Sequence, residues 1–482
     1  MARLIVRGGT VVLPDGTKEQ DVVITDGVIE AVAANVTPSS ADEIVDANNL
    51  FVLPGFIDCH THFGLNTGKM ETLDDFESGS ASAAAGGVTT YINFAPQQRH
   101  ESLVAAAERE LERAKVSLID YALHLSFGTP GSQWQEDLDR VANMGITSMK
   151  VYTTYTDTIY YTSDWNWYRL MEKAAESGIL VQVHAENDAI VNGATEGLVN
   201  RGLTSFQYHG QSRPGIAEYE AVSRGLALAK YTQAPLYFVH LSLPSSVQAV
   251  QNARQEGTPV YAEVCPHHFT LDNAVYSTLN AARYVMTPPL RSLEQMRELR
   301  KLITQELVQT VGSDHCGYTL NQRGSDMDFR AASPGIPGTE TLWPVIYTHL
   351  VATGLMPLHK AVNLVSYHPA AIFGLTPQKG VIAPGYDGDL VLFDPTFTAI
   401  LDEASLHSRA GYSPWHGRKL HGRICQTISR GETVYKNGMV LGRFGRGQFI
   451  QRRRFDPVNV QQILGLMRGD SDRGNRNSSN SR

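Results

Sequence analysis

The sequence predicts an α/β protein: a (β/α)₈ TIM-like barrel with a small β-sandwich domain built from both chain ends. Three observations predict this fold. Eight short apolar runs alternate with stretches of helical composition between residues 54 and 377, and both chain ends carry short strand patterns with turn signals. Ligand-type side chains also stand at the ends of five of the eight runs. Since chemistry gathers at the carboxyl ends of barrel strands, this placement favours a barrel over an open parallel sheet.

The two β-rich ends are expected to pair into one discontinuous domain of residues 1–53 and 378–450. The first end has alternating apolar runs, Leu4–Val6 and Val11–Leu13, followed by a Pro14-Asp-Gly turn. The termini of a domain often lie close together, so a single small sheet domain is expected. Further strand patterns occupy residues 21–25, 28–32, 388–394, 426–431 and 433–438.

Residues 54–377 are expected to form the barrel. Helical stretches such as 103–114 separate the apolar runs. The eight expected strands lie around residues 55–57, 88–94, 119–127, 148–153, 179–184, 236–240, 260–265 and 311–313.

The last part of the chain, residues 451–482, is expected to be a C-terminal arm and a disordered tail. A short helical pattern begins near Val460, and the composition from Arg468 onward is typical of disorder. The basic cluster that starts at Arg452 is interpreted as a subunit contact rather than a nucleic-acid site.

The bulk composition indicates a cytoplasmic enzyme. A formal charge of −8 does not favour nucleic-acid binding, and the sequence has no apolar run of the ~18 residues that a membrane span needs. The apolar run at the start is too short for a signal peptide. Four scattered cysteines without CxxC spacing indicate neither a disulfide framework nor a cysteine zinc site.

His60 and His62 are candidate metal ligands at the end of the first expected strand. Residues i and i+2 of an extended strand point the same way, so both imidazoles can reach one metal ion. The alternative is two surface histidines in a loop. The preceding apolar run, Phe51–Ile57, favours the ligand pair.

Lys150 lies inside an expected buried strand, where an ammonium group is costly. One interpretation is a lysine whose amine reaches solvent at the strand end. The other is an amine made neutral by desolvation, which adds carbon dioxide and becomes a carbamate able to bridge two cations. The presence of the other candidate ligands favours the second.

His184, His240 and Asp314 complete the candidate set. Each histidine ends an apolar run and, taken alone, is more often a core histidine than a ligand. Asp314 would either cap a helix or bind a metal and accept a proton. His267 and His268, after Cys265-Pro, are expected to line the site rather than bind metal.

These motifs, in this order, resemble the cyclic amidohydrolases, above all the dihydropyrimidinases and D-hydantoinases, with allantoinases and dihydroorotases as cousins. The resemblance covers nearly the whole chain. The matching segments are Pro54–His62, Ala83–Thr90, Val183–Asn187, Thr287–Arg291, Gly312–His315 and Gly374–Val391.

The resemblance implies a homotetrameric hydrolase with two divalent metal ions. Zinc suits the ligands, and manganese or cobalt also fits. His60, His62 and Asp314 would hold one ion and His184 and His240 the other. Lys150, carboxylated by CO₂ to N6-carboxylysine, would bridge them. A metal-bridging hydroxide would attack the ring amide carbonyl, and Asp314 would pass its proton to the leaving ring nitrogen.

Three further positions bear on the substrate, a dihydropyrimidine or hydantoin ring. The resemblance implies that Tyr155 donates a hydrogen bond to the developing oxyanion; the alternative is an aromatic wall residue. Thr287 stands where the family commonly has serine and keeps the hydroxyl. Pro334 begins a Pro-Gly-Ile-Pro-Gly-Thr-Glu segment where the family has Asn-Gly-x-Pro-Gly-x-Glu, so the N–H donor is lost.

Three alternatives stay open. An allantoinase-type ureide hydrolase fits Pro334 and the segment from Cys265 to Phe269. A metal-free scaffold of the same fold is less favoured because all six ligand positions are filled. A mononuclear deaminase on the same barrel would not need Lys150.

Overall fold

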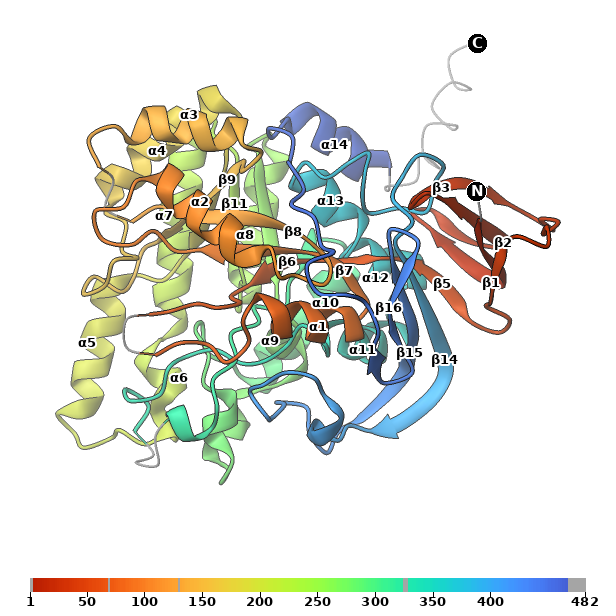
Figure 1. The fold of residues 1–482 in the computed structure, drawn as a ribbon. Coiled ribbons are helices and arrows are strands. Elements are labelled where there is room, and N and C mark those ends of the chain that lie inside the picture. Colours follow the sequence, from red (N-terminus) through yellow and green to blue (C-terminus); the bar gives the residue numbers. More distant parts are fainter. Residues whose placement is uncertain (1–2, 68–69, 129–130, 324–327, 467–482) are drawn as a thin grey trace, which may run out of the picture.

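The computed structural model describes residues 3–67, 70–128, 131–323 and 328–466. Its larger part is a parallel eight-stranded sheet with the strands in chain order (Figure 1). The segment that follows the last strand pairs with the end of the first: Thr61 forms an isolated bridge with His315, and the His62 N–H donates to the His315 carbonyl at 2.8 Å. The sheet therefore closes into a nearly complete barrel. The strands are β6 (Phe56–Thr61), β7 (Val88–Ala95), β8 (Asp120–Ser126), β9 (Ser148–Tyr152), β10 (Leu180–His184), β11 (Leu236–Phe238), β12 (Val260–Val264) and β13 (Thr310–Val311).

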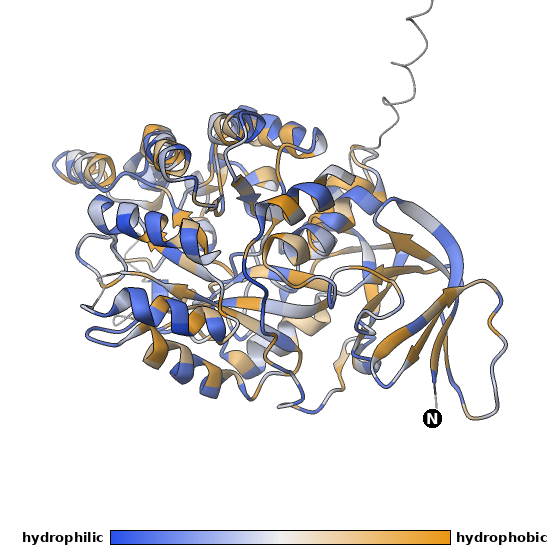
Figure 2. Cartoon of the chain, turned by 90° about the horizontal axis from the view of Figure 1, so that it is seen from above, coloured by the Kyte–Doolittle hydropathy of each residue, from blue (hydrophilic) through white to orange (hydrophobic). Residues whose placement is uncertain are grey.

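Amphipathic helices surround the barrel, with hydrophilic and hydrophobic residues on the same helix (Figure 2). Helix α2 shows why. Its side chains at Leu103, Ala106, Ala107 and Ala114 are buried at helical spacing, and Ser102 caps its first turn. The helices are α1 (Phe76–Ala85), α2 (Leu103–Ala114), α3 (Trp134–Asn143), α4 (Asp164–Ser177), α5 (Asp188–Val199), α6 (His209–Ser212), α7 (Gly215–Thr232), α8 (Pro244–Gln255), α9 (Pro266–Thr270), α10 (Leu293–Thr304), α11 (Leu342–Ile346), α12 (Leu358–Asn363), α13 (Tyr367–Ile372) and α14 (Pro457–Leu466).

Shorter helical turns occupy the connections. They are the 3₁₀ turns η1 (Phe206–Tyr208), η2 (Asn273–Ser277), η3 (Ala281–Tyr284), η4 (Asn321–Arg323) and η6 (Glu403–Ser405), and the π-helical turn η5 (Tyr347–Val351). No helix among the described residues has both the length and the apolar character that crossing a membrane requires.

The two chain ends form a second, nine-stranded sheet, in which β5 pairs with β14. The expected runs Leu4–Val6 and Val11–Leu13 are parts of one strand, because a bulge at Gly8 (φ 77°) lets the strand continue. The predicted fold class is thus confirmed. The strands are β1 (Leu4–Leu13), β2 (Gly16–Thr25), β3 (Val28–Ala33), β4 (Glu43–Asp46), β5 (Phe51–Pro54), β14 (Leu390–Ile400), β15 (Lys419–Ser429), β16 (Glu432–Lys436) and β17 (Met439–Val440).

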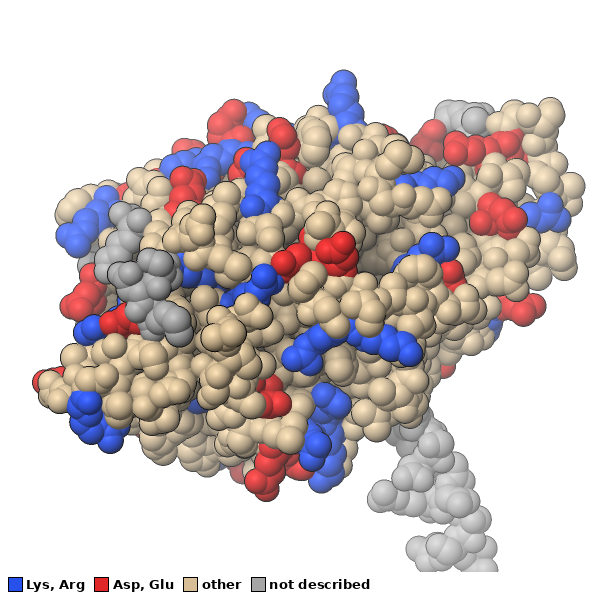
Figure 3. Space-filling model, turned by 90° about the horizontal axis from the view of Figure 1, so that it is seen from below, with Lys and Arg blue, Asp and Glu red and all other residues tan. Residues whose placement is uncertain are grey.

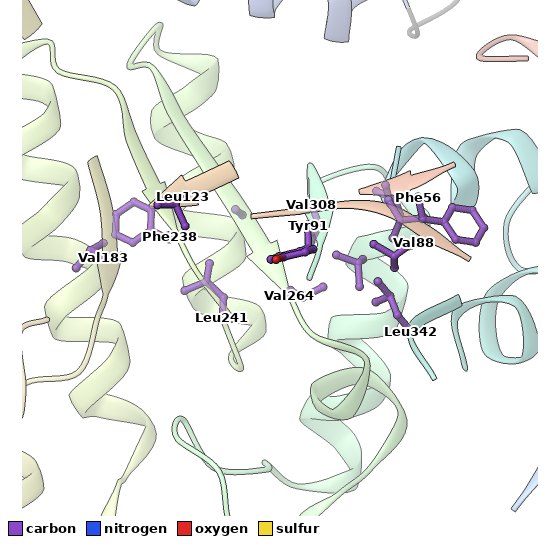
Figure 4. Packing of buried hydrophobic residues seen from close by; sticks show 14 of the residues in the cluster. Phe56, Val88, Tyr91, Leu123, Val183, Phe238, Leu241, Val264, Val308 and Leu342 are labelled. Atoms are coloured by element: carbon purple, nitrogen blue, oxygen red, sulfur yellow. The ribbon is translucent and has the colours of Figure 1, made fainter. Parts of the chain in front are cut away.

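The largest apolar cluster lies between the barrel strands and the outer helices. Figure 4 shows part of it, with Phe56 and Val88 of the barrel near Leu342 of α11. Burial of such side chains stabilises the fold by about 1.5–3 kcal/mol for each fully buried one. A separate cluster, which includes Val6, Leu390 and Ile428, holds the sheet of the chain ends together.

The expected C-terminal arm lies against its own barrel. The Arg452 N–H donates to the Gly145 carbonyl at 3.0 Å, and the Phe455 N–H to the Gly178 carbonyl at 2.8 Å. Arg452, interpreted from the sequence as part of a subunit contact, is buried and donates to Ser148 Oγ at 2.8 Å. The tail expected to be disordered lies outside the described residues.

A buried ion cluster joins the barrel to the sheet of the chain ends. Lys379 Nζ lies 2.7 Å from Asp120 of β8, 2.7 Å from Asp389 and 2.8 Å from Asp387. Burial alone would lower the pKa of Lys379, but the carboxylates outweigh it and raise that pKa. The three acids, which resemble a metal site by their spacing, therefore already hold a cation.

Replacing Lys379 with methionine should destabilise the fold by about 3–5 kcal/mol, because buried carboxylates would lose their partner. The melting temperature of the metal-loaded protein measures this. Lys230→Met, which removes a surface ion pair with Glu256, is the control and should leave the melting temperature unchanged. Equal melting of Lys379→Met and the native protein would contradict the stabilising role.

Candidate active site

A cavity of about 490 Å³ opens at the carboxyl ends of the barrel strands. Its lining includes eight of the residues singled out from the sequence: His62, Lys150, Tyr155, His184, His240, Thr287, Asp314 and Pro334. His60 lies directly beneath, fully buried, within reach of Asp314. The structure therefore brings together every candidate ligand and every candidate substrate-binding residue.

His60, His62 and Asp314 converge on one point. The Nε2 atoms of His60 and His62 lie 3.1 and 3.2 Å from the same Oδ1 of Asp314. Asp314 has a φ of 51°, which turns its side chain back toward the histidines. Nδ1 of His62 forms no hydrogen bond with a described residue, and neither does Nε2 of His60. Three ligand atoms facing one another in this way suit a cation between them.

His184 and His240 form a second pair. Nδ1 of His184 lies 3.0 Å from Nε2 of His240. Nε2 of His184 lies 2.7 Å from Glu186, whose carboxylate also binds Arg213. A carboxylate behind a metal-binding histidine fixes its tautomer and orientation.

Glu263 on β12 supports both groups of histidines and was missed in the sequence. Its Oε1 lies 2.6 Å from Nδ1 of His60 and accepts from the His240 N–H at 2.9 Å. Its Oε2 accepts from the Tyr237 hydroxyl at 2.9 Å. The available signal was a carboxylate in the middle of an apolar strand, which needs a buried partner.

Lys150 is fully buried and its Nζ forms no hydrogen bond or ion pair with any described residue. Nζ lies 4.4 Å from the ring centre of Phe94 and 5.2 Å from that of Tyr152. Burial lowers the pKa of Lys150 to about 7, even though Glu263 and Asp314 act in the opposite direction. A large fraction of this amine is therefore neutral near neutral pH, the form that adds carbon dioxide.

The charges of the site suit metal binding. Burial lowers the pKa of His62 to about 4 and that of His240 well below its usual value, so both imidazoles are neutral and offer lone pairs. Burial would lower the pKa of His60, but Glu263 and Asp314 outweigh it and raise that pKa to about 9, so His60 gives up a proton when it binds a metal. Burial would raise the pKa of Asp314, but His60 outweighs it and holds that pKa well below the usual range. The carboxylate is therefore ionised.

Tyr155 and Thr287 both line the cavity, and their hydroxyl groups are hydrogen-bonded to each other at 2.7 Å. Tyr155 has a φ of 70°, an unusual conformation for a bulky residue, and Arg213 lies 5.2 Å from the centre of its ring. The Pro334 carbonyl lies 4.0 Å from Cys316 Sγ. Hydroxyl donors and a carbonyl acceptor thus border the same space.

Three further histidines lie near the site, and two of them, His267 and His268, differ from expectation. His267 and His268 are buried but do not border the cavity. His315 instead anchors the segment that carries Pro334: its Nδ1 accepts from the Gly338 N–H at 3.2 Å, and its Nε2 lies 3.0 Å from Asp74. Ser408 and the Arg409 N–H, from the connection between β14 and β15, bind the same carboxylate.

Comparison with known proteins agrees with this geometry. The profile of the Amidohydrolase family matches residues 51–434. The D-phenylhydantoinase of Escherichia coli O9:H4 (strain HS) is 36% identical over 464 residues, which cover 94% of this chain and 99% of that protein.

Solved structures give the same result. Dihydropyrimidinase from Brevibacillus agri NCHU1002 has a TM-score of 0.92 and 34% identity, over 94% of this chain and 99% of that one. D-hydantoinase from Bacillus sp. AR9 has a TM-score of 0.91 and 35% identity, over 94% and 100%. The chain therefore belongs to the amidohydrolase family and is a cyclic amidohydrolase of the hydantoinase and dihydropyrimidinase type.

Proposed function

We propose that this enzyme opens a dihydropyrimidine or hydantoin ring by hydrolysis at a binuclear metal centre. The observation that carries the proposal is Lys150, a buried amine without an ion-pair partner among the described residues, at the floor of a cavity walled by metal-ligand side chains. An isolated buried lysine is costly, whereas its carbamate between two cations is not.

The donor set fits two divalent cations. His60, His62 and Asp314 would hold one ion, His184 and His240 the other, and carboxylated Lys150 both. Imidazoles with a carboxylate suit zinc. When bound, the two ions lower the pKa of a water molecule and polarise the ring carbonyl.

The protein's own groups supply the rest of the chemistry. Asp314 is ionised and borders the cavity, so it accepts the proton of the attacking water and delivers it to the leaving ring nitrogen. Tyr155 and Thr287 donate hydrogen bonds to the ring oxygen on which negative charge develops. The Pro334 carbonyl accepts a hydrogen bond from a ring N–H.

We further propose that the ring bears an apolar substituent. The cavity of about 490 Å³ falls within the ~300–1,000 Å³ of sites for drug-sized ligands, far more than a bare ring fills. Leu65, Met70, Val285 and Phe329 line it together with several tyrosines. The names of the relatives, which include D-phenylhydantoinase, support a substituted hydantoin.

An allantoinase-type activity is the second candidate. Pro334 lacks the N–H that an asparagine would offer a hydantoin ring. Asn192, Thr195 and Ser212 line another part of the cavity, where a polar ureide side chain would find partners.

Hydrolysis of a panel by the zinc-loaded enzyme tests the proposal: dihydrouracil, hydantoin, 5-phenylhydantoin, allantoin and dihydroorotate. Ring opening of the hydantoins or dihydrouracil, fastest for 5-phenylhydantoin, is the expected result. Turnover of allantoin alone would replace the proposal with the second candidate. If the protein bound no metal and hydrolysed none of these compounds, the result would favour the metal-free scaffold.

Replacing Tyr155 with phenylalanine should lower kcat about 10²-fold with little change in KM, since the hydroxyl acts on charge that develops only in the transition state. Steady-state kinetics on the best substrate measure both constants. Tyr168→Phe is the control and should keep kcat, because the Tyr168 hydroxyl donates to Glu172 on α4 and is not among the residues that line the cavity. A rise in KM with an unchanged kcat would instead indicate that Tyr155 only forms part of the cavity wall.

The remaining expectations stand as part of the same proposal: a cytoplasmic homotetramer with sheet domain 1–53 and 378–450, barrel 54–377 and C-terminal arm 451–482. On the face shown in Figure 3, acidic and basic side chains are interspersed, which supports a small-molecule rather than a nucleic-acid partner. Light scattering on the protein as it elutes from a size-exclusion column would give the mass of the oligomer.

A further inference from the structure

A second cluster of ligand-type residues lies outside the cavity, where β12 ends and α9 begins. Sγ of Cys265 and one ring nitrogen each of His267 and His268 all lie within 4.8 Å of one another. Cys265 and His267 are fully buried, and His268 is 2% exposed. The signal in the sequence is the run Cys265-Pro-His-His, which puts three ligands within four residues rather than in CxxC spacing.

His267 is the unusual member of the cluster. Neither of its ring nitrogens has a hydrogen-bond partner among the described residues. A buried polar group left unpaired costs about 1–3 kcal/mol, and burial also holds the pKa of His267 well below its usual value. An imidazole in this state is neutral, and its free lone pair indicates a ligand other than a protein group.

His268 is already oriented as a metal-binding histidine would be. Its Nε2 lies 3.1 Å from the Pro288 carbonyl. A carbonyl oxygen only accepts, so Nε2 carries the hydrogen and Nδ1 carries the lone pair. Nδ1 has no partner among the described residues. Donation of the second N–H to a backbone carbonyl is the usual arrangement behind a histidine that binds a metal.

We propose that Cys265, His267 and His268 form a further cation site, separate from the catalytic centre, that takes one zinc ion. One thiolate and two neutral imidazoles are ligands of zinc, and water would complete the tetrahedron. Zinc bonds of ~2.0–2.3 Å put ligand atoms ~3.3–3.7 Å apart, so the side chains would close by at most about 1.5 Å. The Cys265 thiol loses its proton to solvent on binding.

The position of the site indicates a structural role. Cys265 follows Glu263 by two residues on the same strand, and Glu263 holds His60 and His240. A cation between Cys265 and the first turn of α9 would fix the end of this strand. The site would then stabilise the fold without contacting the substrate.

Cobalt substitution tests the proposal, because a thiolate bound to Co²⁺ gives a charge-transfer absorption in the near ultraviolet. The proposed catalytic ligands contain no sulfur, so the absorption reports the new site alone. We expect it in the cobalt-loaded native protein and expect its loss in both Cys265→Ser and His267→Gln. Cys316→Ser is the matched control. Cys316 borders the catalytic cavity and is not one of the proposed ligands, so this variant should keep the absorption.

Three results would overturn the proposal. One is native protein that binds cobalt without the absorption. Another is an absorption that persists in Cys265→Ser and disappears in Cys316→Ser. The third is a bound-metal content equal in native protein and His267→Gln, where the proposal expects one metal ion fewer per chain in the variant. The absorption is independent of ring hydrolysis, so these outcomes are distinct from failure of the proposed activity.

Discussion

Replacing Lys150 with alanine should lower kcat/KM by about 10³-fold or more, at least about 4 kcal/mol of transition-state stabilisation, and should reduce the bound metal at the catalytic centre. The reason is that the variant loses the side chain expected to bridge the two cations. Kinetics on the best panel substrate, with metal analysis of the same sample, measure both effects.

A short carboxylic acid such as propionate should partly restore the activity of Lys150→Ala, because it fits the space vacated by the side chain and supplies a carboxylate. Lys173→Ala is the control for loss of a lysine. Lys173 of α4 pairs with Asp139 of α3 at 2.8 Å, and its loss should leave activity unchanged. Full activity of Lys150→Ala, with the same metal content as the native protein, would refute the bridging role and favour the mononuclear alternative.

The pKa of about 7 gives the same lysine a pH dependence. Only the neutral amine adds CO₂, and its fraction rises with pH through about 7 and then levels off. Reactivation of protein stripped of metal in acid should therefore accelerate with pH over that range, at constant dissolved CO₂ and added zinc. A rate that is flat across it would contradict carboxylation of a neutral Lys150.

Replacing Asp314 with asparagine should lower kcat by about 10²–10⁴-fold while most of the metal stays bound. The amide oxygen still offers a ligand atom, whereas the amide cannot accept the proton of the attacking water. Metal content and kcat therefore separate the two roles of this side chain.

Asp188→Asn provides the control for Asp314→Asn. Asp188 lies at the start of α5, where it accepts from Thr156 Oγ1 at 2.8 Å, and is not among the residues that line the cavity. Its loss should leave kcat unchanged. If Asp314→Asn kept native kcat, another group would have to carry the proton.

Much of the fold and of the ligand set was predictable because local patterns encode them. His60, Lys150 and His184 each belong to an apolar run that the structure has as a strand, β6, β9 and β10. The side chains at the ends of parallel strands must meet at one face of the barrel. The eight strands and the gathering of these residues follow from that rule.

What could not be predicted depends on long-range or irregular geometry. His240 lies beyond the end of β11, with a φ of 39°, so strand periodicity does not orient it. Glu263 contacts His60, which lies 203 positions earlier in the chain, and no local sequence pattern predicts this contact. The link from Ser408 to Asp74 spans 334 positions for the same reason.

That link has a consequence for how the chain could be divided or recombined. The carboxylate of Asp74 sits inside the barrel's mouth, yet two of its donors come from the connection between β14 and β15, and Trp415 of the same connection donates to Thr270 at 3.1 Å. A barrel expressed alone would keep a buried anion stripped of those donors, beside the histidine that seats the Pro334 segment. The two parts are therefore not interchangeable modules: a graft from a relative must carry residues 401–418 together with the barrel loops they meet.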